Sequence, residues 1–397
     1  VLNVEPPTPG QDLYLTLDIR LQKAAQEAMG DYKGAVVAVD PRTGEVLALV
    51  SQPAFDPNWF VEGISYDNYA ELTNNPRQPL FNRFLNGHYP PGSTIKPFLA
   101  LGGLNYGVEE IHHRSFCSGA FVLEGNPRPY RCWKESGHGW VDLHDAIAQS
   151  CDVFFYELAV AMGIDRIHDF LALFGLGKPT GIDLVGEFSG LLPSREWKRR
   201  NRGLPWYPGE TVITGIGQGF MLTTPLQLAQ ATAALASRGK TRRLHLLDSH
   251  QGVNGKRVAD AAAPFPEITV KKQQYWESVI QAMHDVVQGP RGTARATGIG
   301  APYAFAGKSG TAQVFTLEKG QEYNFDELAV DLRDHGLFVA FAPLKDPRIA
   351  VAVVVENGGG GSSVAAPVAR AVMDAWLLEL TPHDGLSASK QPTESAP

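Results

Sequence analysis

Strand-forming runs occur near both ends of this chain, and helix-forming runs fill the middle. Near the front, GAVVAVD (34–40) and EVLALVS (45–51) flank a short turn containing proline and glycine, which is typical of a β-hairpin. Near the back, HGLFVAFAP (335–343) and RIAVAVVVEN (348–357) form a second strand pair. A single antiparallel sheet built from both pairs, with the middle helices as a second subdomain, would bury the apolar faces of all of them. The sequence therefore predicts an α/β protein in the broad sense, without the alternation of a Rossmann fold.

Helical patterns lie between and after these strands, separated by loops with glycine and proline. We expect a helix that Asp18 caps and Gly30 ends, because both residue types favour those positions. Further helices are expected at 93–107, 141–149, 153–162, 165–174, 224–238, 271–288 and 364–380, and two short strands at 303–307 and 311–316.

The order of these elements also divides the chain. We expect a linker at 1–12, a sheet subdomain from about 13–60 and 295–380, an all-helical subdomain over about 61–294, and a disordered polar tail at 381–397. No apolar run reaches the roughly 18 residues of a membrane-spanning helix. Because the chain starts at Val1 and not at Met, we expect it to be part of a longer protein.

Charge and missing motifs narrow the function classes. Lys and Arg total 35 against 42 Asp and Glu, and the resulting net charge of −7 argues against an extensive nucleic-acid surface. No serine lies in G-x-S-x-G, and H-E-x-x-H does not occur. Gly307-Lys308-Ser309 resembles the end of a phosphate-binding loop, but Pro302 stands where that loop requires its first glycine. Hydrolase-elbow, zinc-protease and NTPase interpretations therefore lack support.

A serine followed three residues later by a lysine occurs three times, and one copy is well placed. Ser237 lies where a helix ends, and Ser387 lies in the polar tail. Ser93 and Lys96 open a helix, and their spacing puts both side chains on one helix face. The N-terminus of a helix also offers free N–H groups and positive potential to a developing oxyanion.

Two further motifs follow in order along the chain. Ser150-Cys151-Asp152 comes after a short helical run, and Lys308-Ser309-Gly310-Thr311 stands at a predicted strand start. Each alone has a structural explanation, with Ser150 as a helix cap and Lys308 as a solvated edge charge. The order S-x-x-K, S-x-N or S-x-D, then K-[ST]-G is shared by β-lactamases and penicillin-binding proteins. All three together, each at an element boundary, are hard to attribute to chance.

On these motifs and several longer segments, the chain resembles the transpeptidase domain of class B penicillin-binding proteins, most closely the members that act in rod elongation of Gram-negative bacteria. The resemblance runs from about Leu13 to Leu380. It is carried by NRFLNGHYPPGSTIKPF (82–98), YRCWKESGHG (130–139), SCDVFFYELAVAMGIDRI (150–167), TGIDLVGE (180–187), LPSREWK (192–198), GIGQGFMLTTPLQLA (215–229), GKSGTAQVF (307–315) and FVAFAP (338–343). It implies the serine β-lactamase/penicillin-binding transpeptidase fold, an antiparallel sheet flanked by helices plus an all-helical subdomain.

The resemblance also implies a serine acyl-enzyme mechanism that needs no cofactor. Ser93 would be the nucleophile, Lys96 its general base, and Ser150 the group that passes the proton to the leaving amine. Lys96 can act as a base only when neutral, which burial and the nearby positive charge of Lys308 would favour. The N–H groups of Ser93 and Thr311 would form the oxyanion hole.

The implied substrate is the D-alanyl-D-alanine end of a peptidoglycan stem peptide. Lys308, Ser309 and Thr311 would hold its terminal carboxylate, and Gly310 would let its backbone approach the edge strand. The amino group of a second stem would then resolve the acyl-enzyme into a cross-link. β-Lactam antibiotics resemble the same dipeptide and would acylate Ser93 stably.

Two positions depart from the commonest family pattern. Asp152 stands where many relatives carry Asn, and Ser309 stands in place of Thr. Because an aspartate donates no amide hydrogen bond and adds a negative charge, Asp152 is a weaker candidate for a substrate contact. Other proteins with these motifs stay open as alternatives: a serine β-lactamase or D,D-carboxypeptidase, whose acyl-enzyme is resolved by water, and a β-lactam sensor without turnover.

The resemblance implies further parts and partners of the protein. These are an inner-membrane anchor and a pedestal domain upstream of Val1, a location at the periplasmic face of the membrane, and a SEDS-type membrane glycosyltransferase with other elongation-complex proteins as partners. Trp133 and Trp206 are expected either to line a cleft or to lie in the core.

The three cysteines, Cys117, Cys132 and Cys151, fall in one short stretch together with His138. These four ligands would suit a tetrahedral structural zinc ion, which would attach the loop 115–140 to the second catalytic motif through Cys151. The alternatives are a Cys117–Cys132 disulfide with Cys151 as a buried thiol, or three unlinked thiols with a surface histidine. No ligand role is expected for the remaining histidines considered, His112, His113, His144 and His335.

Overall fold

The structure is a computed structural model that describes residues 10–61, 63–240, 242–252, 255–260, 263–314 and 329–380. The expected tail at 381–397 lies outside these residues, and so does most of the expected linker at 1–12.

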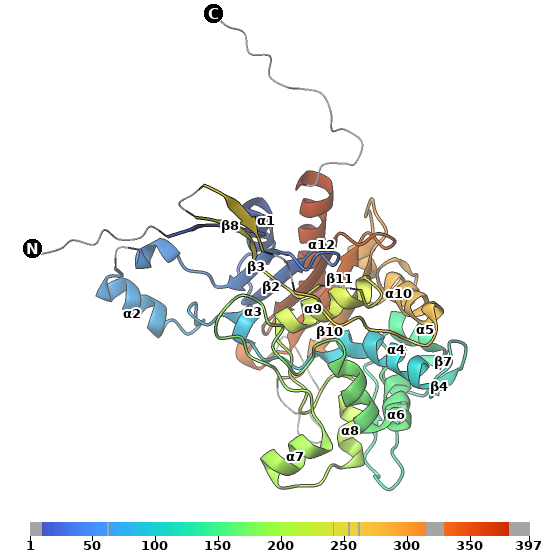
Figure 1. Cartoon of the computed structure of the whole chain (residues 1–397). Helices are drawn as coiled ribbons and strands as arrows, with labels where there is room; N and C mark the ends of the chain where they lie inside the picture. The colour runs from blue at the N-terminus through green and yellow to red at the C-terminus, as the bar shows by residue number, and fades with distance from the viewer. Residues whose placement is uncertain are drawn as a thin grey trace, which may run out of the picture.

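A five-stranded antiparallel sheet joins the two ends of the chain (Figure 1). Its strand order is β10-β11-β12-β2-β3, where the strands are β2 (Gly34–Val39), β3 (Val46–Gln52), β10 (Ala306–Ala312), β11 (His335–Ala342) and β12 (Ile349–Val355). Front and back meet in the ladder between β12 and β2, where Val351 pairs with Ala38. Both strands are buried along their whole length, which explains their unbroken apolar sequences. The predicted fold class is confirmed.

Helices cover both faces of this sheet. On one face α1 (Ile19–Met29) packs against α12 (Gly361–Asp374), which a π-helical turn extends over Ala375–Leu380. Asp18 caps α1 and Gly30 ends it, as expected. On the other face α9 (Pro225–Ala236) contacts β2, β11 and β12, and every residue of α9 is buried.

The middle of the chain adds a helical layer next to β10 (Figure 1). Helix α4 (Lys96–Tyr106) packs against α6 (Asp152–Ala172) and α10 (Gln273–Gln288), and α10 also contacts α5 (Leu143–Ala148). Helix α6 joins two predicted helices, with Gly163 at a φ of 72° between them. The other helical elements are η1 (Pro57–Phe60), α2 (Tyr66–Asn74), α3 (Arg83–Asn86), η2 (Gly92–Ile95), α7 (Arg195–Arg202), α8 (Pro208–Thr214), α11 (Arg295–Gly298) and η3 (Val330–Leu332).

The prediction of two strands at 303–307 and 311–316 is wrong. The described part of this region contains one strand, β10, with the whole Lys308–Thr311 motif in its interior. Hydrogen bonding to β11 pairs Lys308 with Val339 and Gly310 with Leu337. This pairing outweighs the weak strand propensity of Lys-Ser-Gly.

The region 61–294 is not all-helical as expected, because it contains short strands as well as helices. These are β4 (Ser115–Cys117), which pairs with β7 (Gly139–Val141), and β5 (Ala120–Phe121), which pairs with β6 (Tyr130–Arg131). A separate three-stranded sheet places β8 (Leu247–Gln251) between β1 (Asp12–Leu15) and β9 (Arg257–Ala259), so strand structure begins at the end of the expected linker. The expected subdomain boundaries stay a prediction.

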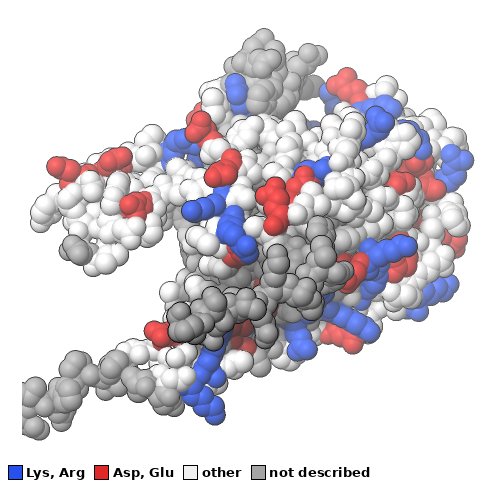
Figure 2. Space-filling view, turned by 90° about the horizontal axis from the view of Figure 1, so that it is seen from above, with Lys and Arg blue, Asp and Glu red and all other residues white. Residues whose placement is uncertain are grey.

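Among the described residues, no helix has both the length and the apolar character needed to cross a bilayer. On the face of the molecule shown in Figure 2, basic and acidic side chains lie interspersed.

Candidate active site

The candidate nucleophile Ser93 lies in the 3₁₀ turn η2 and not within an α-helix. Helix α4 follows directly and begins with Lys96, whose side chain is fully buried. Gly92 lets the turn approach the edge strand β10: its φ is 53°, and a Cβ there would lie 2.6 Å from the carbonyl oxygen of Thr311. The first and third motifs are therefore in direct contact.

The Lys96 ammonium group reaches across to the second motif. Its Nζ lies 2.7 Å from Asp152 Oδ1, 2.9 Å from the Ser150 carbonyl oxygen and 3.2 Å from Ser150 Oγ. These contacts join the start of α4 to the junction between α5 and α6 in one buried ion pair. The predicted grouping of Lys96 with Ser150 and Asp152 is thus present in the structure.

Ser150 occupies the bend between α5 and α6 in a conformation that is unusual for a residue other than glycine. Its φ is 56°, in the left-handed region. Lys308 Nζ, which is fully buried, lies 3.0 Å from Ser150 Oγ and 2.9 Å from the Ser309 carbonyl oxygen. The Ser150 hydroxyl therefore connects the amino groups of Lys96 and Lys308.

The electrostatic surroundings of Lys308 disfavour its charged form. Burial, and then the positive charge of Lys96, lowers the pKa of Lys308 well below its usual value, whereas Asp152 opposes the shift. Lys308 consequently reaches its neutral form at a lower pH than an exposed lysine would.

Asp152 interacts with protein groups through both carboxylate oxygens. Oδ1 accepts from Lys96, and Oδ2 accepts from the main-chain N–H of Trp133 at 2.8 Å. Asp152 is also nearly buried. These contacts fit a residue that orients Lys96 better than one that contacts substrate, in agreement with the departure from Asn noted in the sequence.

The edge strand β10 borders the site, and Thr311 is its exposed residue. Ser309 Oγ lies 3.1 Å from Thr293 Oγ1, and Gln218 Nε2 donates to the carbonyl oxygen of Thr311 at 2.9 Å. A Cβ at Gly310 would lie 2.8 Å from Thr94 Cγ2, so a side chain there would push against the nucleophile turn. Glycine is needed at this position for close contact with η2.

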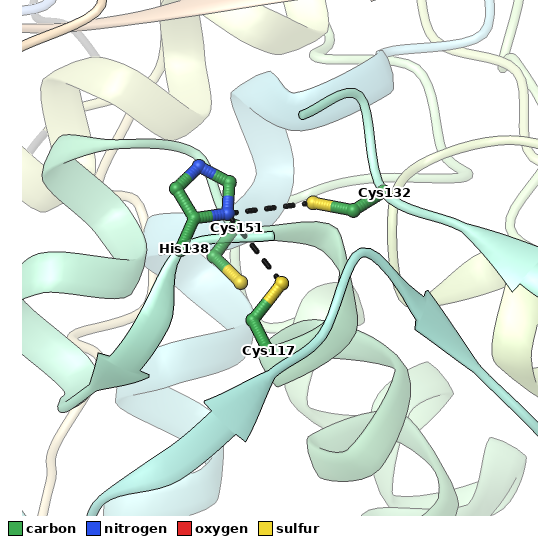
Figure 3. Close-up of side chains that lie close together, drawn as sticks. All are labelled: Cys117, Cys132, His138 and Cys151. Atoms are coloured by element: carbon green, nitrogen blue, oxygen red, sulfur yellow. Dashed lines mark hydrogen bonds between the residues drawn. The ribbon is translucent and has the colours of Figure 1, made fainter. Parts of the chain in front are cut away.

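The four candidate metal ligands lie together (Figure 3), and one of them, Cys151, belongs to the second motif. His138 Nδ1 lies 3.6 Å from Cys117 Sγ and 3.5 Å from Cys132 Sγ, and all four ligand atoms, including Cys151 Sγ, lie within 4.8 Å of one another. All three cysteines are buried and free of disulfides. The hydrogen bond between Cys151 and Cys132 lowers the pKa of the Cys132 thiol and raises that of Cys151.

A comparison with known families decides the relationship. Residues 34–374 match the family described as the penicillin binding protein transpeptidase domain. The chain belongs to this family. Its transpeptidase domain contains all three motifs at positions 93–96, 150–152 and 308–311.

Individual relatives agree with this assignment. The peptidoglycan D,D-transpeptidase MrdA of Acinetobacter baumannii is 47% identical over 95% of the chain. The chain spans between 55% and 59% of the length of the curated relatives named MrdA that it matches. A crystal structure of Pseudomonas aeruginosa PBP2 in complex with WCK 5153 is 50% identical and has a TM-score of 0.86, covering 94% of this chain and 77% of that one. A complex of PBP2 with MreC from Helicobacter pylori is 31% identical with a TM-score of 0.82, covering 92% of this chain and 64% of that one.

The sequence left open whether Trp133 and Trp206 line a cleft or lie in the core, and it assigned no role to Thr293 and Gln218. Trp133, which is 58% exposed, contacts the second motif, whereas Trp206 is buried. Thr293, in the loop after α10, contacts Ser309 of β10. Gln218, in the segment before α9, contacts Thr311 of the same strand. Gln218 lies in the segment GIGQGF, which carried the resemblance, so its place in a family motif was the available signal.

Proposed function

We propose that this chain is the catalytic part of a peptidoglycan D,D-transpeptidase that cross-links stem peptides during cell elongation through an acyl-enzyme on Ser93. The observation that carries the proposal is the convergence of Lys96 and Lys308 on the Ser150 hydroxyl, next to the turn that holds Ser93. The names of the MrdA relatives support the same activity.

The arrangement offers a route to an active base. Lys96 pairs with Asp152, while Lys308 is the lysine whose pKa is lowered. A substrate carboxylate that binds beside Lys308 would stabilise its ammonium form. One proton can then pass from Lys96 through the Ser150 hydroxyl to Lys308, which leaves Lys96 neutral.

Acylation follows from this state. Lys96 takes the Ser93 proton as Ser93 Oγ attacks the carbonyl carbon of the penultimate D-alanine, and the N–H groups of Ser93 and Thr311 hold the resulting oxyanion. The C–N bond then breaks, and the leaving D-alanine amine receives its proton through Ser150. The amine of a second stem attacks the ester carbonyl, loses a proton by the same route and releases Ser93 with a new peptide bond.

Substrate would lie along β10, with Lys308, Ser309 and Thr311 around its terminal carboxylate. β10 is an edge strand of the sheet, so an extended peptide can add to it. Thr311 is exposed, which makes its hydroxyl available to a ligand.

Labelling with a fluorescent penicillin tests the proposal. We expect a long-lived adduct on the wild-type chain, none on Ser93→Ala, and normal labelling of Ser237→Ala, which removes the serine of another S-x-x-K sequence. Rapid hydrolysis of the penicillin would contradict the proposal and indicate a β-lactamase. A stable adduct without cross-linking, measured with a polymerising partner and lipid-linked precursor, would instead indicate a sensor.

We also propose a location at the periplasmic face of the inner membrane and partners in the elongation complex, including a SEDS-type glycosyltransferase. The H. pylori PBP2 complex with MreC supports partners of this kind. A full-length protein that does not copurify with any elongation-complex protein would contradict this.

We further propose that Cys117, Cys132, His138 and Cys151 bind a structural zinc ion. Zn–S and Zn–N bonds of about 2.3 and 2.0–2.1 Å at a tetrahedral angle separate sulfur from nitrogen by about 3.6 Å. The separations from His138 Nδ1, 3.6 and 3.5 Å, match this value before any rearrangement. The ion would hold the loop between β4 and β7 against Cys151, next to Ser150.

Metal analysis combined with thiol titration tests the zinc proposal. We expect about one zinc per chain, three thiols after unfolding with a chelator, and loss of zinc in Cys117→Ser. His113→Ala is a matched control, because His113 pairs with Glu109 outside the cluster. Substoichiometric zinc together with a single free thiol would overturn the proposal and support a disulfide.

A further inference from the structure

Trp133 is an exposed residue whose two N–H groups both point into the protein. It lies between β6 and β7, directly after Cys132, and the residue is 58% exposed. Its main-chain N–H donates to Asp152 Oδ2 at 2.8 Å. Its indole N–H donates to the carbonyl oxygens of Ser150 at 3.0 Å and Gln149 at 3.1 Å.

The Ser150 carbonyl group accepts hydrogen bonds that hold Ser150 in its unusual backbone conformation. Ser150 has a φ of 56°, a conformation that residues other than glycine hold only when their surroundings enforce it. Its carbonyl oxygen accepts from Lys96 Nζ at 2.9 Å on one side and from the Trp133 indole on the other. If this peptide rotated, the Ser150 hydroxyl would move away from one or both lysines.

We propose that Trp133 is a positioning residue for acylation: its indole N–H holds the left-handed Ser150 so that the hydroxyl spans Lys96 and Lys308. The inference rests on the proposed function, because it concerns the proton route of that reaction. Trp133 acts through Ser150 and needs no contact with the reacting atoms.

The contacts distinguish this role from simple loop packing. The Trp133 ring lies against His138, with ring centroids 5.4 Å apart in an edge-to-face arrangement. A phenylalanine would preserve most of that ring contact and would lose the donor. The main-chain bond to Asp152 would also survive, because it does not involve the side chain.

The test compares Trp133→Phe with Trp140→Phe in the whole chain. Trp140 is a matched control, since it is also 58% exposed, lies on the neighbouring strand β7 and packs its ring against Phe116. We expect the rate constant for acylation by a fluorescent penicillin to fall at least about tenfold in Trp133→Phe, with the thermal midpoint unchanged. The pH profile of that rate should shift as well, because the hydroxyl no longer spans both lysines. Trp140→Phe should match wild type in all three measurements.

A second variant removes the donor without changing the ring shape. Benzothienylalanine in place of Trp133 keeps the bicyclic ring and replaces N–H by sulfur, so it should show the same loss even if Trp133→Phe disturbs the loop. Equal rates and pH profiles in wild type and both variants would overturn the inference. A loss explained entirely by a smaller folded fraction would overturn it too. An absence of labelling in the wild type would instead contradict the proposed function itself.

Discussion

Two buried lysines donate to one serine hydroxyl at the centre of this site. Lys96 and Lys308 both have fully buried side chains, and Asp152 is the carboxylate that pairs with Lys96. Burial, and then repulsion by the positive charge of Lys96, lowers the pKa of Lys308, and the single carboxylate of Asp152 only partly opposes this shift. A substrate carboxylate would supply the missing negative charge, so ligand binding and proton placement should be linked at this residue.

This linkage should appear as proton uptake when a carboxylate ligand binds. In the free protein the pKa of Lys308 is lowered, and a bound carboxylate raises it again. Between the two values Lys308 is neutral when free and protonated when bound. Where Lys96 cannot supply this proton, as in Lys96→Met, binding takes the proton up from solvent. We therefore expect the binding enthalpy of a penicillin to Ser93→Ala combined with Lys96→Met, which cannot be acylated, to depend on the ionisation enthalpy of the buffer. The dependence should vanish in Ser93→Ala combined with Lys308→Met, and equal enthalpies in all buffers would contradict the coupling.

Gly217 should not tolerate any side chain, because it is in direct contact with the turn η2 that holds Ser93. Gly92 N donates to the Gly217 carbonyl oxygen at 2.9 Å, and a Cβ on Gly217 would lie 2.2 Å from the Gly92 carbonyl oxygen. Its φ of 70° adds backbone strain. We expect Gly217→Ala to lower the free energy of unfolding by about 2–4 kcal/mol and to abolish penicillin labelling. Gly203→Ala, with a φ of 65° and open space at its Cβ, should cost only about 1 kcal/mol and keep labelling. Similar unfolding curves for both would refute the argument.

The end of strand β12 anchors the segment that leads to Ser93. Glu356, just past β12, accepts from the Tyr89 hydroxyl at 2.6 Å and from Arg83 Nε at 3.0 Å, and it pairs with Lys33 at 2.9 Å. Arg83 is buried, and Glu356 is the carboxylate with which it forms an ion pair. Tyr89 in turn exchanges two main-chain hydrogen bonds with Thr223 before the chain reaches η2. Contacts at the end of β12 therefore hold in place the stretch of chain that precedes Ser93.

Loss of the Glu356 charge should destabilise the protein strongly. Glu356→Gln leaves Arg83 buried without its carboxylate, and we expect a loss of about 3–5 kcal/mol in urea unfolding at neutral pH. Glu277→Gln removes the partner of Arg238 in an exposed ion pair and should cost about 1 kcal/mol or less. Equal losses of unfolding free energy in the two variants would show that the buried ion pair contributes no more to stability than the exposed one.

The same network should give the protein an acid-sensitive stability. Burial raises the pKa of Glu356, but the hydrogen bond from Tyr89 and the charges of Arg83 and Lys33 outweigh it and hold the pKa below its usual value. A lowered carboxylate pKa contributes stability above the unfolded value of about 4.3, and the contribution is lost as pH falls through the folded value. Wild type and Glu356→Gln should therefore differ most at neutral pH and converge below about pH 4. A difference that stays constant with pH would contradict this.

At the scale of elements, prediction succeeded where hydrophobic pattern and end signals agree, as in α1 between Asp18 and Gly30. It failed where pairing with a strand distant in the sequence determines the secondary structure. The run Lys308-Ser309-Gly310 has poor strand propensity, yet β10 continues through it because β11 supplies partners along its whole length. Sequence spacing likewise placed Ser93 in a helix, whereas contact between Gly92 and Thr311 holds it in a 3₁₀ turn.

At the scale of the whole molecule, the three motifs predicted that Lys96, Ser150 and Lys308 lie close together, and the fold explains how they come into contact. The sheet joins β2 and β3 from the front with β10 to β12 from the back, and the helical layer between them carries Ser150 and Lys96. Trp133 could not be assigned in advance, since its role depends on where its N–H groups point after folding. The cysteines could be grouped by their proximity in sequence, but the separations that suit a metal required the fold.

The candidate active site lies between the sheet and the helical layer, so it should be lost only when these two layers separate. The buried apolar side chains form one contiguous core that includes Val37 in the sheet, Phe155 in α6 and Trp276 in α10. Helix α10 packs against β10, and α9 is buried along its whole length against the sheet. We therefore expect the sheet and the helical layer to unfold together despite the length of the chain, in which independent unfolding of parts would otherwise be common. Urea transitions followed by circular dichroism, tryptophan fluorescence and penicillin labelling of Ser93 should coincide. Loss of labelling at a urea concentration well below the circular dichroism transition would show that the helical layer opens on its own, and the two expected subdomains would then be separate folding units.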